Sequence, residues 1–152
     1  MIERIKKLQA TLKEVTDYAD LYPPDLVKVK PDPKAFSANE IVYHLLEVEE
    51  LWQRRLHQLL HSEDKHFMQI DPDALAKEHR YNQQSYAEGI AAWRAAREET
   101  IDLLEAMTED EIRIVGIHSR YGEMDTYRIV EIIADHDLQH LKQMQRTFDQ
   151  VR

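Results

Sequence analysis

The chain has 152 residues, a formal net charge of −9 and no cysteine. This length fits a single domain over residues 1–152, and the lack of thiols excludes a disulfide framework, a thiolate metal site and a cysteine nucleophile. The negative charge disfavours nucleic-acid binding. With neither a signal peptide nor an apolar stretch of about 20 residues, the sequence indicates a cytoplasmic protein that does not enter membranes.

Few glycines and prolines interrupt the chain, which favours long helices. The first predicted helix runs from about Ile2 to Asp20, with apolar residues at spacings of three and four. The proline-rich segment Leu21 to Ala35 ends it. The second helix opens with the capping-box pattern Ser37-x-x-Glu40 and continues to about Leu60.

The third predicted helix has the least defined start. After a polar connector from Ser62 to Asp73, it begins at Leu75 or Arg80 and ends near Met107. Its stripe follows a helical spacing and consists of Tyr86, Ile90, Trp93, Arg97, Ile101 and Leu104.

The end of the chain predicts a short extended segment and a fourth helix. Residues 112–117 have an extended character, and a turn near Tyr121 and Gly122 makes the segment hairpin-like. The last helix follows Asp125 as N-cap and runs to about Val151. We therefore predict an all-α fold, a four-helix bundle with a short irregular or hairpin-like segment before the last helix.

Two histidine pairs have a spacing of four, which places both rings on one face of a helix. His57 and His61 fall opposite the apolar stripe of the second helix and are expected to face solvent. His136 and His140 flank the apolar face of the last helix. A half-buried pair of metal ligands is expected at such a flank.

An open metal site commonly has three protein ligands, and His44 lies at a similar flank of the second helix. In an up-down-up-down bundle the second and last helices run parallel. His44 then lies about 10 Å into its helix and the His136/His140 pair about 16–22 Å into theirs, which are compatible depths. The alternative is that His44 is a partly buried, hydrogen-bonded core residue.

Two stretches resemble the DinB/YfiT-like metal-binding bundles, and the resemblance extends over essentially the whole chain. Phe36-Ser37-Ala38-x-Glu40-x-x-x-His44-Leu45 resembles the second-helix signature, with Phe36 where Trp is usual. The residues His118-x-x-Tyr121-Gly122-x-x-Asp125 and His136-Asp137-x-x-His140-x-x-Gln143 are similar to the signature of the last helix.

The resemblance implies that His44, His136 and His140 hold one divalent metal, nickel or zinc first and iron or manganese as alternatives. It also implies a homodimer and, as in some members, activity with a low-molecular-weight thiol. The leading hypothesis is a metal-dependent enzyme for a small molecule, a thiol-dependent S-transferase or related hydrolase in stress or detoxification. The alternatives are a non-catalytic metal-binding dimeric module and a structural bundle whose histidines bind nothing specific.

Three further residues are candidates for the site. Glu47 lies one turn beyond His44 and is predicted as a catalytic base or an acceptor for an imidazole N–H, the alternative being a surface glutamate. Asp137 interrupts the apolar stripe of the last helix. It either supports a ligand or makes structural hydrogen bonds, and a buried Arg, Tyr or His would serve as its partner. His118 either reaches the open side of the site or is an ordinary loop histidine.

Overall fold

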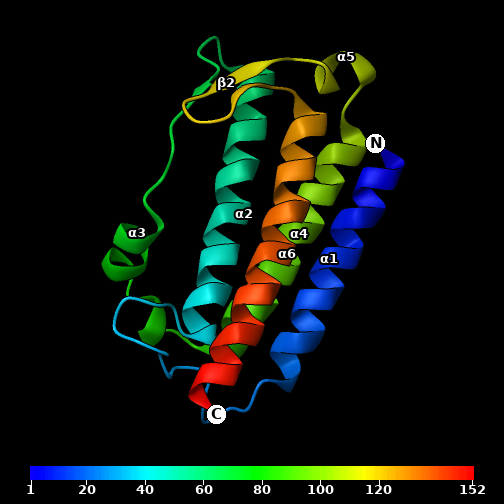
Figure 1. The fold of residues 1–152 in the computed structure, drawn as a ribbon. Helices are drawn as coiled ribbons and strands as arrows, with labels where there is room; N and C mark the ends of the chain where they lie inside the picture. The colour runs from blue at the N-terminus through cyan, green and yellow to red at the C-terminus, as the bar shows by residue number, and fades with distance from the viewer.

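Four long helices form the body of the molecule, as the computed structural model of residues 1–152 shows (Figure 1). Their apolar faces meet in a common core, which confirms the predicted four-helix bundle. The short elements lie in the two connections that follow the second and third long helices. The long helices are α1 (Ile2–Leu21), α2 (Ala38–His61), α4 (Tyr86–Ala106) and α6 (Thr126–Val151).

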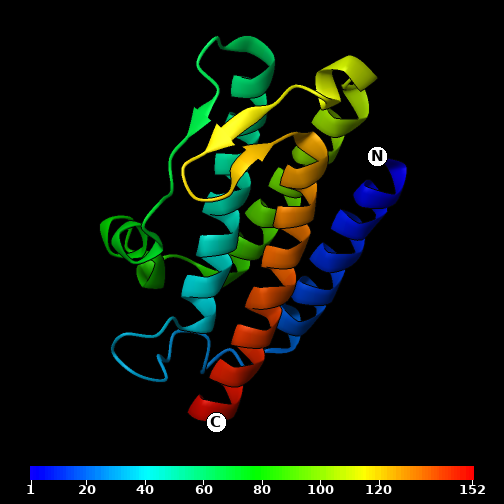
Figure 2. The ribbon, with the colours of Figure 1, turned by 45° about the horizontal axis from the view of Figure 1, so that its top comes forward.

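A small sheet covers one end of the bundle (Figure 2). The strands β2 (Gly116–His118) and β3 (Gly122–Met124) pair antiparallel, which confirms the hairpin-like segment before the last helix. The extended stretch begins at Gly116 and not at Ile112, because Ile112 ends a short helix. The strand β1 (His66–Phe67) pairs parallel to β2 and lies in the connector that we predicted without a strand. Only main-chain pairing with distant residues makes this two-residue segment a strand.

The helix directions differ from the up-down-up-down arrangement that we predicted, so that part of the prediction was wrong. In Figure 1, α1 and α6 run one way and α2 and α4 run the other, so α2 is antiparallel to α6. The reason is the connection between α2 and α4, residues 62–85, which returns along the outside of the bundle. Around the bundle, α1 packs against α4 and α6, and α2 also packs against α4 and α6.

That same connection corrects the predicted start of the third helix. The segment splits into α3 (Pro72–Glu78), a 3-10 turn (Tyr81–Gln83) and α4. Arg80 takes a left-handed conformation with φ 51°, which interrupts the helical path. The helix then restarts at Ser85, whose side chain accepts a hydrogen bond from the Glu88 N–H.

Local signals place the other helix starts as predicted. At α2 the Ser37 side chain accepts from the Glu40 N–H, and the Glu40 carboxylate accepts from the Ser37 N–H. Asp125 caps α6 by accepting from the Arg128 N–H. A second capping box begins the four-residue helix α5 (Glu109–Ile112). None of the helices combines the length and the apolar character that crossing a bilayer requires.

The core consists of two apolar clusters with a buried polar layer between them. One cluster lies toward the sheet and includes Leu56 and Ile129. The other lies toward the opposite end and includes Ile41 and Met144. Every long helix contributes to what we call the polar layer, which comprises Thr11, Glu49, Arg97, Thr100 and Asp137.

Candidate metal centre

Three histidines from two helices converge on one point. The Nε2 atom of His136 lies 3.1 Å from Nε2 of His44 and 2.9 Å from Nε2 of His140. His44 and His140 are buried, with 4% and 8% of their surface exposed, and His136 is half-buried. The structure therefore brings together the three residues that the sequence predicted as ligands.

The antiparallel packing of α2 and α6 makes this meeting possible. His44 lies in the second turn of α2, close to the end of the bundle where α6 finishes. His136 and His140 lie one turn apart in α6, on the face that packs against α2. The predicted depths of the histidines assumed that α2 and α6 are parallel, which was wrong. The three residues still meet, because α6 runs toward the start of α2.

Burial keeps the three rings uncharged. Desolvation lowers the pKa of His44 to about 3 and that of His136 to about 2, and repulsion between the rings adds to both shifts. The pKa of His140 is also lowered by burial. A neutral imidazole keeps one nitrogen lone pair free, which is the form that binds a metal.

The donor set fits a single metal ion. Two nitrogens that each bond one zinc ion at about 2.0–2.1 Å lie roughly 3 Å apart, as the neighbouring Nε2 atoms do here. All three ligand atoms lie within 4.8 Å of one another. A neutral imidazole ring has only one N–H, so hydrogen bonds among the rings cannot provide a partner for all three converging Nε2 atoms. A single cation can accept a lone pair from each of them.

Gln143 orients one of these rings, a role that we did not predict. Its Oε1 atom lies 2.6 Å from Nδ1 of His140. The Nδ1–H donates to this oxygen, which leaves the lone pair of His140 on Nε2, directed at the other two rings. The spacing of three residues on a helix after His140 is the sequence signal that could have identified Gln143.

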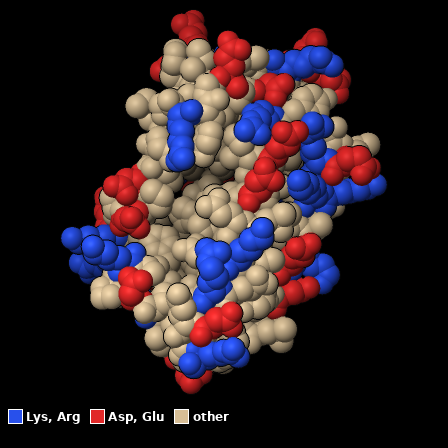
Figure 3. Space-filling model, in the orientation of Figure 1, with Lys and Arg blue, Asp and Glu red and all other residues tan.

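A cavity of about 260 Å³ opens onto the cluster, and His44, His140 and Gln143 line it. The space-filling view shows this face hollowed between α3 and α6, with uncharged residues at the centre of the hollow (Figure 3). The lining also includes three further polar residues, Lys34, Asp73 and Gln139, and three apolar ones, Ala35, Phe36 and Pro72. A larger cavity of about 710 Å³ lies between the end of α1 and the start of α4 and contains none of the three histidines.

Glu47 contacts the segment that follows α3. Its carboxylate accepts a hydrogen bond from the Tyr81 hydroxyl and contacts Nδ1 of His79. The side chain thus holds the connection between α3 and α4 against α2. Its predicted part in catalysis stays a prediction.

Asp137 is 1% exposed and belongs to the polar layer. Its oxygens accept hydrogen bonds from Arg97 and Thr11. Desolvation acts against the charge of Arg97, but attraction to Glu49 and Asp137 outweighs it and raises the pKa of Arg97. The partner of the buried carboxylate is therefore a charged Arg, one of the residue types that the sequence suggested.

The other singled-out histidines lie apart from the cluster. Nδ1 of His118 accepts from the main-chain N–H groups of Arg120 and Tyr121, and its ring stacks on Trp52. His118 thus closes the hairpin turn. His57 and His61 are exposed on α2, on the solvent side as predicted.

Comparison with known proteins shows a family and a fold. The sequence profile of the DinB superfamily matches residues 7–144. The structure is similar to that of YfiT from Bacillus subtilis, described as a probable metal-dependent hydrolase with an unusual four-helix bundle topology. The TM-score is 0.78 at 12% identity, over 95% of this chain and 85% of that one.

The structure is also similar to that of TT2238, described as a four-helix bundle protein. The TM-score is 0.71 at 20% identity, over 95% of this chain and 97% of that one. No curated protein matches the sequence. At these identities the two structural similarities show the fold.

Proposed function

Because this chain belongs to the DinB superfamily, we propose that it is a metal-dependent enzyme whose centre is formed by His44, His136 and His140. The observation that carries the proposal is the convergence of the three Nε2 atoms beside a cavity. Nickel and zinc are the favoured ions and iron is an alternative, because imidazole donors suit all three. Manganese is the other alternative, although it prefers oxygen donors.

The substrate is a small molecule that enters the cavity beside His44 and His140. The cavity volume of about 260 Å³ suits a compact ligand, and Lys34, Asp73 and Gln139 offer it polar contacts. When bound, the ion supplies positive charge that lowers the pKa of a water or thiol held at its open face. Gln143 keeps the proton of His140 on Nδ1, so that Nε2 stays available.

The proposed reaction is an S-transfer with a low-molecular-weight thiol or a related hydrolysis, in stress or detoxification. The description of YfiT as a probable metal-dependent hydrolase supports the hydrolytic reaction. The transferase is supported by the resemblance of the two histidine signatures to a family in which some members use low-molecular-weight thiols. Glu47 is the proposed proton-transfer residue, and the protein acts as a cytoplasmic homodimer. The second candidate is a dimeric module that binds the metal without turnover.

Metal content tests the centre. We expect about one transition-metal ion per chain in the tag-free protein, measured by plasma mass spectrometry, and loss of that ion in His136→Ala/His140→Ala. The matched control is His57→Ala/His61→Ala, which removes an exposed pair with the same helical spacing and should keep the ion. Absence of metal from all three proteins, even after incubation with nickel, zinc, manganese and iron(II), contradicts the proposal.

Turnover separates the two candidate functions. If the protein is an enzyme, it should convert at least one thiol–electrophile pair or ester in a screen. The His44→Ala variant should lack that activity, and added metal should not restore it. A protein that binds metal but shows no turnover across the screen is the non-catalytic module. Glu47→Gln, tested on any activity found, shows whether this carboxylate takes part.

A further inference from the structure

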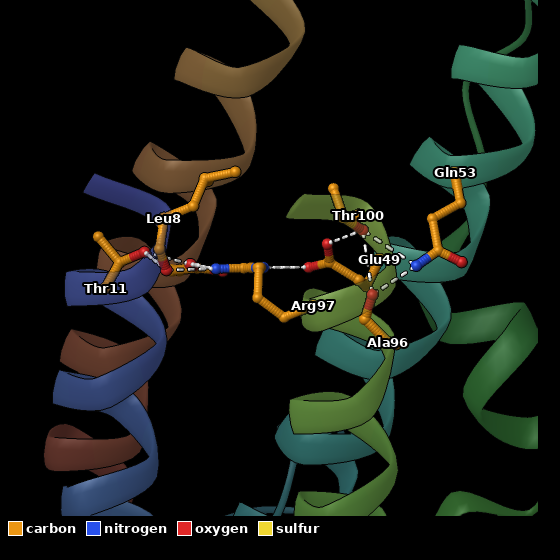
Figure 4. Close-up of polar contacts among 8 residues, drawn as sticks. Leu8, Thr11, Glu49, Gln53, Ala96, Arg97 and Thr100 are labelled. Carbon is orange, nitrogen blue, oxygen red and sulfur yellow. Dashed lines mark hydrogen bonds and ion pairs between the residues drawn. The ribbon is translucent and has the colours of Figure 1, made fainter. Parts of the chain in front are cut away.

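Arg97 is a fully buried arginine, 0% exposed, whose guanidinium lies between two carboxylates (Figure 4). Its Nε atom donates to Oε1 of Glu49 at 2.8 Å, and Nη2 lies 2.7 Å from the same oxygen. Nη1 and Nη2 donate to Oδ2 and Oδ1 of Asp137 at 2.9 and 3.0 Å. Nη1 also donates to the main-chain oxygen of Leu8 at 2.8 Å. The guanidinium therefore contacts α1, α2 and α6 at once.

These contacts join the two helices that carry the histidines. Asp137 lies three residues before His140 in α6, and Glu49 lies five residues after His44 in α2. Along the helix axes the separations are about 4.5 and about 7.5 Å. Because α2 and α6 are antiparallel, His44 and His140 lie on the same side of the polar layer.

The guanidinium restricts rotation of both helices. A rotation of α6 by about 10° moves an atom about 6 Å from its axis by roughly 1 Å. A metal site tolerates errors of only about 0.2 Å in the distance from ion to ligand. Apolar packing is non-directional, whereas the paired hydrogen bonds between Arg97 and Asp137 have a fixed geometry.

From this arrangement we propose that Arg97 is a positioning residue of the metal centre. By binding Glu49 and Asp137 together, it sets the rotation of α2 and α6 at which the three Nε2 atoms converge. Asp137 supports the centre through Arg97, since its own oxygens bind Arg97 and Thr11. The inference rests on the proposed function, because it assigns Arg97 to that same centre.

A variant that fills the polar layer with apolar side chains distinguishes a positioning role of Arg97 from a role in stability alone. Removing only Arg97 would leave two buried carboxylates unpaired, and such a chain can fail to fold. In Glu49→Leu/Arg97→Met/Asp137→Leu the three charges are replaced together by side chains of similar volume, a change that often preserves stability. Arg97→Lys keeps the charge and removes the planar fork. Leu104→Ala, in the apolar cluster near the sheet, lowers stability without altering the layer.

The readout is the nickel dissociation constant, measured by competition with a chelator. We expect binding to weaken about 10- to 100-fold in the triple variant and in Arg97→Lys. Leu104→Ala should stay within about twofold of the unaltered protein. A folded triple variant that binds nickel as tightly as the unaltered protein overturns the inference while leaving the proposed function intact.

A metal-free readout keeps the two proposals separable. The rings of His44 and His140 have centroids 4.6 Å apart, so the metal-free protein should give a nuclear Overhauser effect between their protons. This signal should persist in Leu104→Ala and disappear in the triple variant. If the signal persists in the triple variant, the role of Arg97 is overturned, whether or not the unaltered chain binds metal. Absence of metal from the unaltered chain, by contrast, contradicts only the proposed function.

Discussion

At the scale of single residues, the two nitrogens of His140 have different partners. Nε2 faces His136, and Nδ1 faces the Gln143 carbonyl oxygen. The second contact determines which nitrogen carries the proton, and thereby whether the lone pair points toward the other histidines. Gln143 thus acts on the centre without being a ligand.

We predict that Gln143→Met weakens metal binding about 10- to 100-fold, because the His140 ring loses the acceptor that fixes its proton. The half-buried side chain keeps a similar size, so the unfolding free energy should change little. Competition with a chelator measures the affinity. Gln139→Met, in the same cavity but without a bond to a histidine ring, is the control. Equal affinities of the two variants would contradict the role of Gln143.

At the scale of elements, the start of α2 connects a local sequence signal to the site. Ser37 is fully buried, accepts from the Glu40 N–H and donates to Oδ1 of Asn82. It therefore caps the helix and also attaches it to the 3-10 turn. His44 lies in the following turn, so the cap stabilises the segment that presents this ring.

We expect Ser37→Ala to lower the unfolding free energy by about 1–2 kcal/mol, since it removes the cap and leaves buried groups unpaired. Thr108→Ala removes the other capping box, which begins the exposed four-residue helix α5. Its cost should be about 0.5 kcal/mol, the low end for a lost N-cap, because the helix is short and exposed. Urea unfolding of the two variants makes the comparison, and a larger loss for Thr108→Ala would contradict it.

At the scale of the whole molecule, burial of the histidines links folding to pH. In the metal-free protein the pKa values of His44 and His136 are about 3 and 2, and that of His140 is also lowered. An unfolded histidine has a pKa of about 6.5. Below that pH the unfolded chain takes up protons that the folded chain does not.

The metal-free protein should therefore have its full stability above pH 6.5 and lose it progressively as the pH falls. The slope is about 1.4 kcal/mol per pH unit for each proton taken up on unfolding. Urea unfolding between pH 7.5 and 5 measures it. His136→Ala/His140→Ala should show a shallower dependence, because two of the buried rings are gone. The same slope in both proteins would mean that other groups cause the pH dependence.

Helical periodicity and capping residues predicted the long helices, and the Ser37 and Asp125 caps are confirmed. These signals are local, since a period or a cap depends on residues within one or two turns. Asp137 already stood out as a charge within an apolar stripe, but no local signal identifies the partner of a buried charge. That partner lies on another helix, and the distance between them depends on packing.

By itself, then, the sequence determined the four helices and the hairpin and indicated the His136/His140 pair, because periodicity, caps and a spacing of four act within a single element. His44 lies on another helix and was predicted as the third ligand mainly from the family resemblance. The tertiary structure alone decided the helix directions, the break at Arg80, the contacts of Glu47 and the polar layer. Each of these depends on the path of residues 62–85 outside the bundle. That path makes α2 and α6 antiparallel and places His44 opposite His136 and His140, a contact between residues far apart in the chain.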